Sequence, residues 1–291
     1  MAAARGRGGT GDTADTLPMS VGEPAGGHTV RGSASPRERT VQVNGQPCRV
    51  WEKGDGEPLF FLAGLVGLPR WTPVLDLLAK QRRVIAPSLP GFHGSAGHDV
   101  LDSHLDWITA TLDLLEAAGL DEGDLMGVSL GGSLAAEVAA LSPPRVRRLV
   151  LACPFGLFDD REPAADVFAQ RPSELDALLC SKPELLAALR TRPEGCDEIE
   201  WQVLGARAAE AAARLLWPLG DTGLARRLHR ICARTLLLWG SDDRVLPGSY
   251  ARRIAAGIAG PVELHTLAGA GHLLDLDAPE TVAENVLTFL A

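Results

Sequence analysis

Long apolar runs are absent from this sequence of 291 residues. A helix that spans a membrane needs about 20 consecutive apolar residues, and no stretch here approaches that length. The first residues also lack the apolar core of a secretion signal. We therefore expect a cytoplasmic protein with no membrane partner.

Cysteines are few, and their spacing indicates neither a redox pair nor a metal site. Cys48, Cys153, Cys180, Cys196 and Cys232 are an odd number, with no C-x-x-C pair and no histidine-rich metal spacing. We expect reduced thiols, no bound metal and no cofactor. Cys153 ends a predicted strand, where it is either a small buried apolar residue, the interpretation we favour, or a residue that faces a pocket.

Excess positive charge is also absent. The chain has 28 Lys and Arg residues against 37 Asp and Glu residues, a net charge of −9, and no basic stripe that would follow a phosphate backbone. We therefore expect no nucleic-acid partner. With 46% hydrophobic residues the chain can bury a large core, and α/β proteins of about 250 residues commonly form one unit with an inserted cap.

Short apolar runs alternate with helical stretches through most of the chain. The continuous runs lie at residues 59–63, 84–86, 125–128, 149–152 and 235–239. Such runs suit strands of a parallel sheet that is buried on both faces. Residues 41–52 predict a β-hairpin around Asn44 and Gly45. Residues 101–120 predict a helix. Its apolar face would carry Leu105, Ile108, Leu112, Leu115 and Ala118.

The most informative segment is residues 124–132, which places Ser129 in a G-x-S-x-G pattern with Gly127 and Gly131. The pattern follows a short apolar run and precedes an alanine-rich helical run. A serine on such a strand-to-helix turn presents its hydroxyl at the end of a sheet, where a neighbouring base can activate it. The two glycines leave room for close backbone approach. Ser129 is therefore the candidate nucleophile.

Two later strands end in the partners that a nucleophilic serine needs. The apolar run at residues 235–239 leads into a loop with Asp242 and Asp243, and a second strand runs into a glycine-rich turn with His272. The order along the chain is serine, acid, histidine. This order differs from those of the chymotrypsin and subtilisin groups.

From about residue 40 to the C-terminus, the chain resembles the α/β-hydrolase superfamily. Esterase and peroxidase-like members carry W-G-x-x-D-x-x-x-P after the seventh strand and G-x-G-H near the C-terminus. The matching residues are Trp239, Gly240, Asp243 and Pro247 for the first motif, and Gly269, Gly271 and His272 for the second. The resemblance implies that Asp243, rather than Asp242, orients the imidazole and that His272 is the base.

The resemblance also implies an oxyanion hole. One donor would be the backbone N–H of Leu130, and the other would be the N–H of Leu65, in a loop that aligns with the family's H-G-x-x-G motif. The sequence departs from that motif at Ala63, where histidine is common. A further loop at residues 86–95 resembles the family's D-x-P-G-x-G-x-S segment, with Ser88 in the acidic position and His93 expected at the rim of the pocket.

Residues 155–232 contain no evident strand and read as short helices broken by prolines. Family members insert a helical cap at this point, which would select substrate and exclude water, although the segment equally suits a helical subdomain that serves stability. Four residues are candidates for the lining of the pocket. They are Trp71, Trp201, Trp217 and Leu273.

The expected architecture is an α/β-hydrolase fold, with a mostly parallel eight-stranded sheet, flanking helices and a helical cap after the sixth strand. Its parts would be a disordered tail at residues 1–37, a core at 38–154 and 233–291, and the cap at 155–232. We predict a serine hydrolase that cleaves a carboxylic ester, thioester or lactone in a small apolar acyl-containing substrate.

Two alternatives remain open at this point. The first is a carbon–carbon bond hydrolase of dienoate ring-cleavage products, which uses the same triad but often has asparagine and tryptophan where this chain has Val128 and Leu273. The second is a ligand-binding relative without turnover. The sequence does not indicate the oligomeric state.

Overall fold

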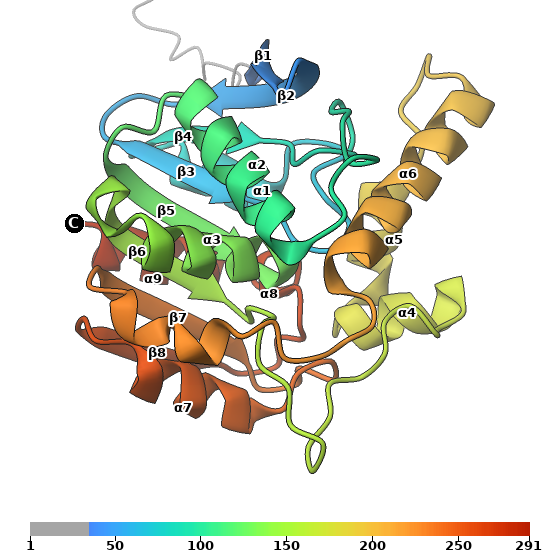
Figure 1. Ribbon diagram of the computed structural model, residues 1–291. Helices are drawn as coiled ribbons and strands as arrows, with labels where there is room; N and C mark the ends of the chain where they lie inside the picture. Colours follow the sequence, from blue (N-terminus) through green and yellow to red (C-terminus); the bar gives the residue numbers. More distant parts are fainter. Residues whose placement is uncertain (1–34) are drawn as a thin grey trace, which may run out of the picture. The chain divides into compact units, whose positions relative to one another are not determined.

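Eight strands form one sheet in the computed structural model, which describes residues 35–291. The strands are β1 (Arg37–Val43), β2 (Gln46–Lys53), β3 (Pro58–Leu62), β4 (Arg83–Pro87), β5 (Gly123–Val128), β6 (Val146–Ala152), β7 (Arg234–Gly240) and β8 (Val262–Leu267). Their order across the sheet is β1-β2-β4-β3-β5-β6-β7-β8 (Figure 1). Only β2 pairs antiparallel with its neighbours, β1 and β4, within the described sheet. The predicted mostly parallel eight-stranded sheet is confirmed.

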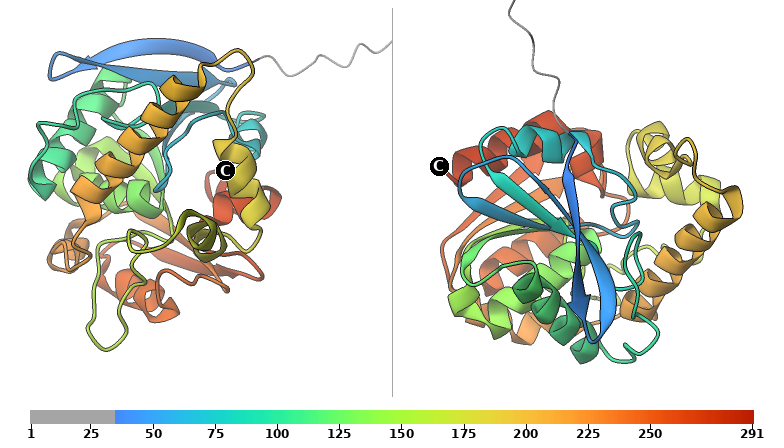
Figure 2. Two further views of the ribbon diagram at one scale, coloured as in Figure 1. Left: turned by 90° about the vertical axis from the view of Figure 1, so that its right-hand side faces the viewer. Right: turned by 90° about the horizontal axis from the view of Figure 1, so that it is seen from above.

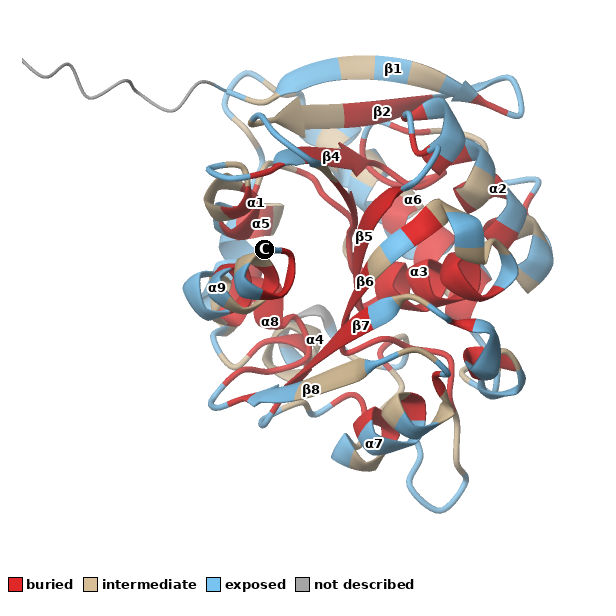
Figure 3. Cartoon of the chain, turned by 90° about the vertical axis from the view of Figure 1, so that its left-hand side faces the viewer, coloured by how far each residue is buried: buried red, intermediate tan, exposed pale blue. Residues whose placement is uncertain are grey.

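The central strands are buried because helices cover both faces of the sheet. All six residues of β5 are buried, as are the last four of β6. Figure 3 shows these strands in red between two helical layers. The hairpin joining β1 and β2 turns at Asn44 and Gly45, which adopt φ values of 51° and 73° as a two-residue type I′ turn requires.

The predicted tail at residues 1–37 falls almost entirely outside the described residues, which begin at Ser35. Its boundary is wrong at one position, because Arg37 is the first residue of β1 and pairs with Glu52 of β2. The hairpin therefore starts four residues before Val41, where the apolar pattern first shows it. Polar residues extend this edge strand without leaving a sequence signal.

Helices pack on both faces of the sheet. α1 (Pro73–Leu78) and α9 (Pro279–Phe289) contact each other on one face, while α2 (His104–Ala117), α3 (Ser129–Leu141) and α7 (Gly248–Gly257) cover the other (Figure 3). Short helices α8 (Leu274–Asp277) and η1 (Pro143–Arg145) complete this core.

Helix α2 is shorter than the predicted span of 101–120. Ser103 caps it by accepting a hydrogen bond from the N–H of Asp106, whose carboxylate accepts in return from Ser103. Leu105, which we assigned to the buried face, is 61% exposed, so that assignment is wrong. Ile108, Leu115 and Ala118 are buried as predicted, and Trp107 and Leu114 extend the buried face.

Three helices lie between β6 and β7 in the chain: α4 (Pro172–Leu179), α5 (Pro183–Arg190) and α6 (Glu198–Leu216). They are followed by the 3-10 turns η2 (Leu224–Arg226) and η3 (Leu228–Arg230), and residues 153–233 contain no strand. Figures 1 and 2 show the three helices beyond the carboxyl ends of the parallel strands. The limits 155–232 for a separate cap domain stay a prediction.

None of the helices within residues 35–291 combines the length and the apolar character needed to cross a bilayer.

Candidate active site

Ser129 occupies a strained position directly after β5, at the first residue of α3. Its φ is 55°, a conformation that residues with side chains seldom adopt. A Cβ added to Gly127 would lie 2.3 Å from the carbonyl oxygen of Gly131, and one added to Gly131 would lie 2.4 Å from that of Leu62. Both glycines are therefore required for this turn, as the motif predicts.

The structure brings Ser129, His272 and Asp243 together from three separate loops. The Oγ of Ser129 lies 2.8 Å from Nε2 of His272, and Nδ1 of His272 lies 3.0 Å from Oδ2 of Asp243. Ser129 and His272 are completely buried, and the side chain of Asp243 is 1% exposed. Their positions follow from the topology, because β5, β7 and β8 are parallel and their carboxyl ends share one edge of the sheet.

The environment of Asp243 favours its ionised form. Burial alone would raise its pKa, but the His272 imidazole and two backbone N–H groups hold the pKa of this carboxyl below its usual value. Those N–H groups belong to Val245 and Leu246 and lie 2.8 and 2.9 Å from Oδ1. Asp242, in contrast, is exposed and accepts a hydrogen bond from the Ser241 hydroxyl. The choice of Asp243 as the partner of the imidazole thus agrees with the geometry.

Cys153 is buried, in agreement with the interpretation that we favoured, and it also lies beside Asp243 and His272. It follows β6 with a φ of 43°, is fully buried, and its Sγ accepts a hydrogen bond from the Gly240 N–H at 3.5 Å. Its sulfur and one ligand atom each of Asp243 and His272 lie within 4.8 Å of one another. Burial raises the pKa of the thiol well above its usual value, and the nearby Asp243 carboxylate adds to this shift. A protonated thiol beside a hydrogen-bonded imidazole and carboxylate is a poor donor set for a metal.

The two predicted oxyanion donors border Ser129. Leu130 is the second residue of α3, so its N–H belongs to the first turn and has no carbonyl partner within the helix. A Cβ added to Gly64 would lie 3.3 Å from Cβ of Ser129, which places the loop that contains Leu65 against the serine. The N–H of Gly67 closes this loop on the carbonyl of Gly64 at 2.9 Å. That both amides act as donors stays a prediction.

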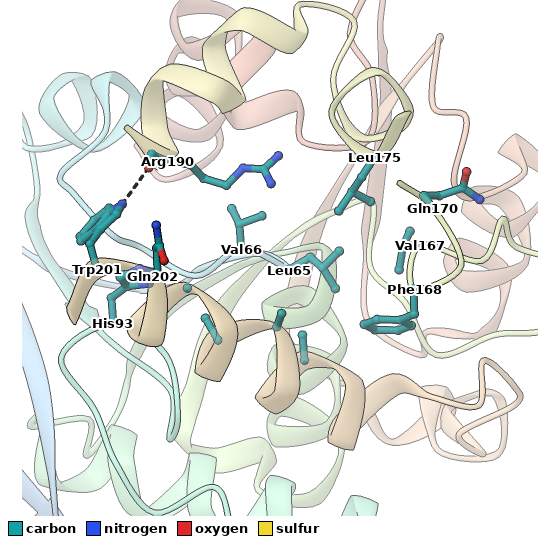
Figure 4. Close-up of a pocket in the computed structure, with 14 residues that line it drawn as sticks. Leu65, Val66, His93, Val167, Phe168, Gln170, Leu175, Arg190, Trp201 and Gln202 are labelled. Carbon is teal, nitrogen blue, oxygen red and sulfur yellow. Dashed lines mark hydrogen bonds between the residues drawn. The ribbon is translucent and has the colours of Figure 1, made fainter. Parts of the chain in front are cut away.

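A cavity of about 380 Å³ lies between this loop and the three helices that follow β6. It is lined by Leu65, Val66, His93, Val167, Phe168, Gln170, Leu175, Arg190, Trp201, Gln202, Gly205, Ala208, Ala209 and Ala212. Figure 4 shows His93, Trp201, Gln202 and Arg190 toward one end, Val167, Phe168 and Leu175 toward the other, and Leu65 between them. The lining is mostly apolar, and its volume is in the range of small-molecule sites.

Comparison with known proteins decides the family. Residues 59–285 match the model of the Alpha/beta hydrolase family. The chain belongs to this α/β-hydrolase family. It is 30% identical over 274 residues to a 2-hydroxy-6-oxo-2,4-heptadienoate hydrolase of Pseudomonas putida, covering 87% of this chain and 96% of that protein.

Two further similarities support the same placement of this α/β hydrolase. It is 31% identical over 265 residues to a dihydrolipoyllysine-residue acetyltransferase component of the acetoin cleaving system of Pseudomonas putida, covering 88% of this chain and 70% of the relative. The solved structure of a membrane phospholipase A has the same fold, with a TM-score of 0.71, 24% identity, and coverage of 89% of this chain and 87% of that one.

The structure corrects two of the four predicted pocket residues of the α/β hydrolase. Trp201 lines the cavity, whereas Trp71 and Trp217 do not. Trp71 is half-buried near β2, where its Nε1 donates to Asp76 and its ring meets that of Trp51. Trp217 is 60% exposed because α6 ends just before it.

Leu273 lies next to the oxyanion loop rather than in the wall of the cavity. It is buried beside the oxyanion loop, where its Cδ2 would lie 2.9 Å from a Cβ on Gly64, but it does not line the large cavity. His93, which we placed at the rim, forms part of the cavity wall itself and faces the ring of Trp201 at 5.1 Å. Burial, assisted by the charge of Arg49, lowers the pKa of His93 to about 4, so its imidazole is neutral at pH 7.

Several lining residues escaped the sequence analysis. Arg190 points into the cavity (Figure 4) and forms an ion pair with Asp176. A single half-buried arginine at the end of a helix leaves no pattern that identifies it. On α6, in contrast, small residues recur at a spacing of three or four: Gly205, Ala208 and Ala212. This spacing indicates that one face of the helix carries only small side chains and so leaves space beside it.

Proposed function

We propose that this protein is a serine hydrolase that cleaves a carboxylic ester, thioester or lactone through an acyl-enzyme. The observation that carries the proposal is the continuous line of hydrogen bonds from Ser129 through His272 to Asp243, at 2.8 and 3.0 Å. Three groups in this order can move a proton from a hydroxyl to an imidazole at neutral pH. The neighbouring apolar cavity supports a small substrate with an apolar acyl group.

In the first half of the reaction, Nε2 of His272 accepts the proton of Ser129 while Oγ attacks the substrate carbonyl. The ionised Asp243 holds the imidazole in the productive orientation and stabilises it once it is charged. The N–H groups of Leu65 and Leu130 donate to the oxyanion of the tetrahedral intermediate. The intermediate collapses to the acyl-enzyme as His272 returns the proton to the leaving oxygen or sulfur.

In the second half, water replaces the leaving group. His272 accepts a proton from the water as its oxygen attacks the acyl carbonyl, and the same two amides stabilise the second oxyanion. Collapse of this intermediate breaks the bond to Ser129, whose oxygen regains the proton from His272. The products are a carboxylic acid and the regenerated enzyme.

The proposal is tested by replacing Ser129 with alanine. We expect Ser129→Ala to lower kcat for p-nitrophenyl esters by roughly 10³-fold or more, because the acyl-enzyme then has no oxygen on which to form. A fluorophosphonate should label the wild-type protein on the peptide that contains residue 129 and leave the variant unlabelled, as read by peptide mass spectrometry. Circular dichroism should show an intact fold.

Ser133→Ala is the matched control, because Ser133 is a buried serine one turn further along α3 with no hydrogen bond from its hydroxyl among the described residues. This variant should label and turn over as the wild type does. Labelling that persists in Ser129→Ala would disprove the assignment. A wild-type protein that neither labels nor hydrolyses any ester, thioester or lactone would favour a ligand-binding role.

The second candidate is hydrolysis of a carbon–carbon bond in a dienoate. One observation favours it, the relative whose name specifies a 2,4-heptadienoate. Arg190 in the cavity wall is paired with Asp176 and would bind the carboxylate of such a substrate by exchanging that partner. Val128 and Leu273, which stand where many such hydrolases have asparagine and tryptophan, favour ester cleavage. The loss of absorbance of a coloured dienoate, compared with p-nitrophenyl ester hydrolysis as kcat/KM, separates the two reactions.

A further inference from the structure

The segment between α4 and α5 is hydrogen-bonded to the stretch of chain that follows His272. The N–H of Leu273 donates to the carbonyl of Leu179 at 2.9 Å. The carboxylate of Asp277 accepts from the N–H groups of Ser181 and Lys182 at 2.8 and 3.0 Å, and Nζ of Lys182 donates to the Asp277 carbonyl at 2.9 Å. Four hydrogen bonds thus join segments that are more than ninety residues apart, Asp277 and Ser181 being separated by 96 positions.

The same carboxylate also holds the residue before the histidine. Oδ2 of Asp277 accepts from the N–H of Gly271 at 2.8 Å, and Asp277 is only 3% exposed. Hydrogen bonds from several N–H groups to one buried carboxylate are charge-assisted and stronger than those between neutral groups. A Cβ on Gly271 would lie 2.9 Å from both Oδ2 of Asp277 and the nitrogen of Ser181. Gly271 is therefore needed for this junction as well as for the turn.

His272 is consequently held on both sides. Gly271 before it is bonded to Asp277, and Leu273 after it is bonded to Leu179 at the end of α4. A movement of the α4–α5 segment must pull on both neighbours of the imidazole. Its Nε2 has to stay at hydrogen-bonding distance from the Ser129 hydroxyl, and a displacement of about 1 Å in such a group costs about 10²-fold in rate.

The two helices that flank this segment, α4 and α5, also contact the cavity. Leu175 of α4 and Arg190 of α5 lie in the cavity wall, on either side of the residues that Asp277 binds. A ligand that fills the cavity presses against both helices. The hydrogen bonds of Asp277, together with the bond from Leu273 to Leu179, link those helices directly to the loop of His272.

We propose that Asp277 is a positioning residue that couples the α4–α5 wall of the cavity to His272, so that a cavity-filling substrate also fixes the imidazole in place. This inference rests on the proposed function, in which His272 is the base. It adds that substrates long enough to reach Leu175 and Arg190 have a higher kcat than short ones, rather than only a lower KM.

The test replaces Asp277 with asparagine, which keeps the size of the side chain and removes its charge. We expect kcat for a cavity-filling p-nitrophenyl ester to fall by about 10- to 100-fold, with KM changing less than about threefold. For p-nitrophenyl acetate the decrease should be smaller, so the kcat advantage of the longer ester disappears. Backbone hydrogen exchange, followed by mass spectrometry, should become faster both in residues 268–276 and in residues 179–183.

Asp242→Asn is the control, because Asp242 is exposed and its carboxylate accepts from Ser241 rather than from either segment. Its backbone N–H donates to Ala270, and asparagine keeps that bond. It should leave kcat and exchange unchanged. If Asp277→Asn does not fold, Lys182→Met serves instead, since it removes the Nζ bond to the Asp277 carbonyl from an exposed side chain. We expect Lys182→Met to change kcat and exchange in the same direction by about two- to threefold.

Unchanged kcat, or a loss of activity that is equal for short and long esters without faster exchange at residues 179–183, would overturn the inference. Failure of the proposed function gives a different result. In that case the wild-type protein does not turn over esters, but Asp277→Asn still accelerates exchange in both segments. Without that acceleration the coupling itself is disproved.

Discussion

Asp275 lies three residues after His272 and is buried, yet its Oδ1 has no hydrogen-bond partner within residues 35–291. Burial raises the pKa of this carboxyl to about 6, and the negative charge of Asp277 adds to the effect. The proposed mechanism assigns it no step. Its ionisation therefore costs stability in the folded state without a compensating partner on that oxygen.

We therefore expect Asp275→Asn to become more stable, relative to the wild-type protein, as the pH rises. The folded pKa is raised above that of the unfolded chain, so the wild-type protein has the full benefit of the protonated carboxyl below about pH 4 and loses it as the pH rises through about 6. Asparagine stays neutral throughout. Relative to wild type, the variant should gain about 3 kcal/mol in free energy of unfolding between pH 4 and pH 8.

Urea unfolding of both proteins at the two pH values measures this gain, since the other titrating groups are the same in both and cancel in the difference. If the stability difference between the two proteins is the same at pH 4 and pH 8, Asp275 ionises as easily in the folded protein as in the unfolded chain, and the prediction is wrong.

At the scale of the element, α6 forms one wall of the cavity with small residues. Gly205 lies in the middle of this helix, where glycine costs about 1 kcal/mol relative to alanine. A Cβ at this position would meet no atom within 4 Å, so packing against the protein does not require a glycine. Gly205 lines the cavity, and we interpret it as space kept for substrate.

Filling that space should change which substrates are accepted. We expect Gly205→Leu to lower kcat/KM for a cavity-filling p-nitrophenyl ester by about tenfold or more, because the new side chain occupies the cavity, while activity on the acetate ester stays within about twofold. Thermal stability should rise slightly, since leucine favours helix more than glycine does.

Ala206→Leu adds the same side chain to the next residue of α6, which is exposed and outside the cavity wall. Its activity on both esters should match that of the wild type. If Gly205→Leu retains the preference for the longer ester, the α6 face does not contact the substrate.

At the scale of the whole molecule, the two ends of the sheet have different tasks. Ser129 follows the carboxyl end of β5, whereas Asp124 lies near its amino end and is completely buried. Three arginines surround that carboxylate: Arg82, Arg147 and Arg148, the last at 2.8 Å. Burial opposes ionisation, but hydrogen bonds from Arg148 and Arg147 hold the pKa of Asp124 below its usual value.

Asp124→Asn should therefore destabilise the fold without altering the chemistry. Removing the charge leaves Arg82, itself buried, without its charged partner and with the Leu290 carbonyl as its remaining acceptor among the described residues, which costs about 3 kcal/mol or more at pH 7. Because the folded pKa is depressed, this contribution is present above about pH 4 and is lost as the pH falls. Denaturant unfolding should show the loss, and kcat of the folded variant at low temperature should equal that of the wild type.

A changed kcat in folded Asp124→Asn would show that the two ends of the sheet are coupled. The separation is expected from the topology, because parallel strands place every carboxyl end on one side and every amino end on the other. Stability and chemistry are thus assigned to opposite ends of the same strand.

The sequence by itself determined the fold class, and it pointed to Ser129, Asp243 and His272, whose side chains the fold brings within hydrogen-bonding distance. Each of these rests on a local pattern: an apolar run that ends in a turn of defined composition, where a glycine at position 127, 131 or 271 meets a backbone that tolerates no Cβ. Local patterns of this kind can be identified from the sequence because the strand, the turn and the proposed functional residue are neighbours in the chain.

The tertiary structure alone decided most of the cavity wall and the contacts that surround the histidine. It placed Trp71 and Trp217 away from the cavity, Cys153 beside Asp243, and the carboxylate of Asp277 on two N–H groups from the α4–α5 segment. These contacts join segments that are far apart in the chain, and each partner has an ordinary composition in its own surroundings. The physical reason is that such contacts depend on how the layers pack, and packing leaves no periodic trace in either segment.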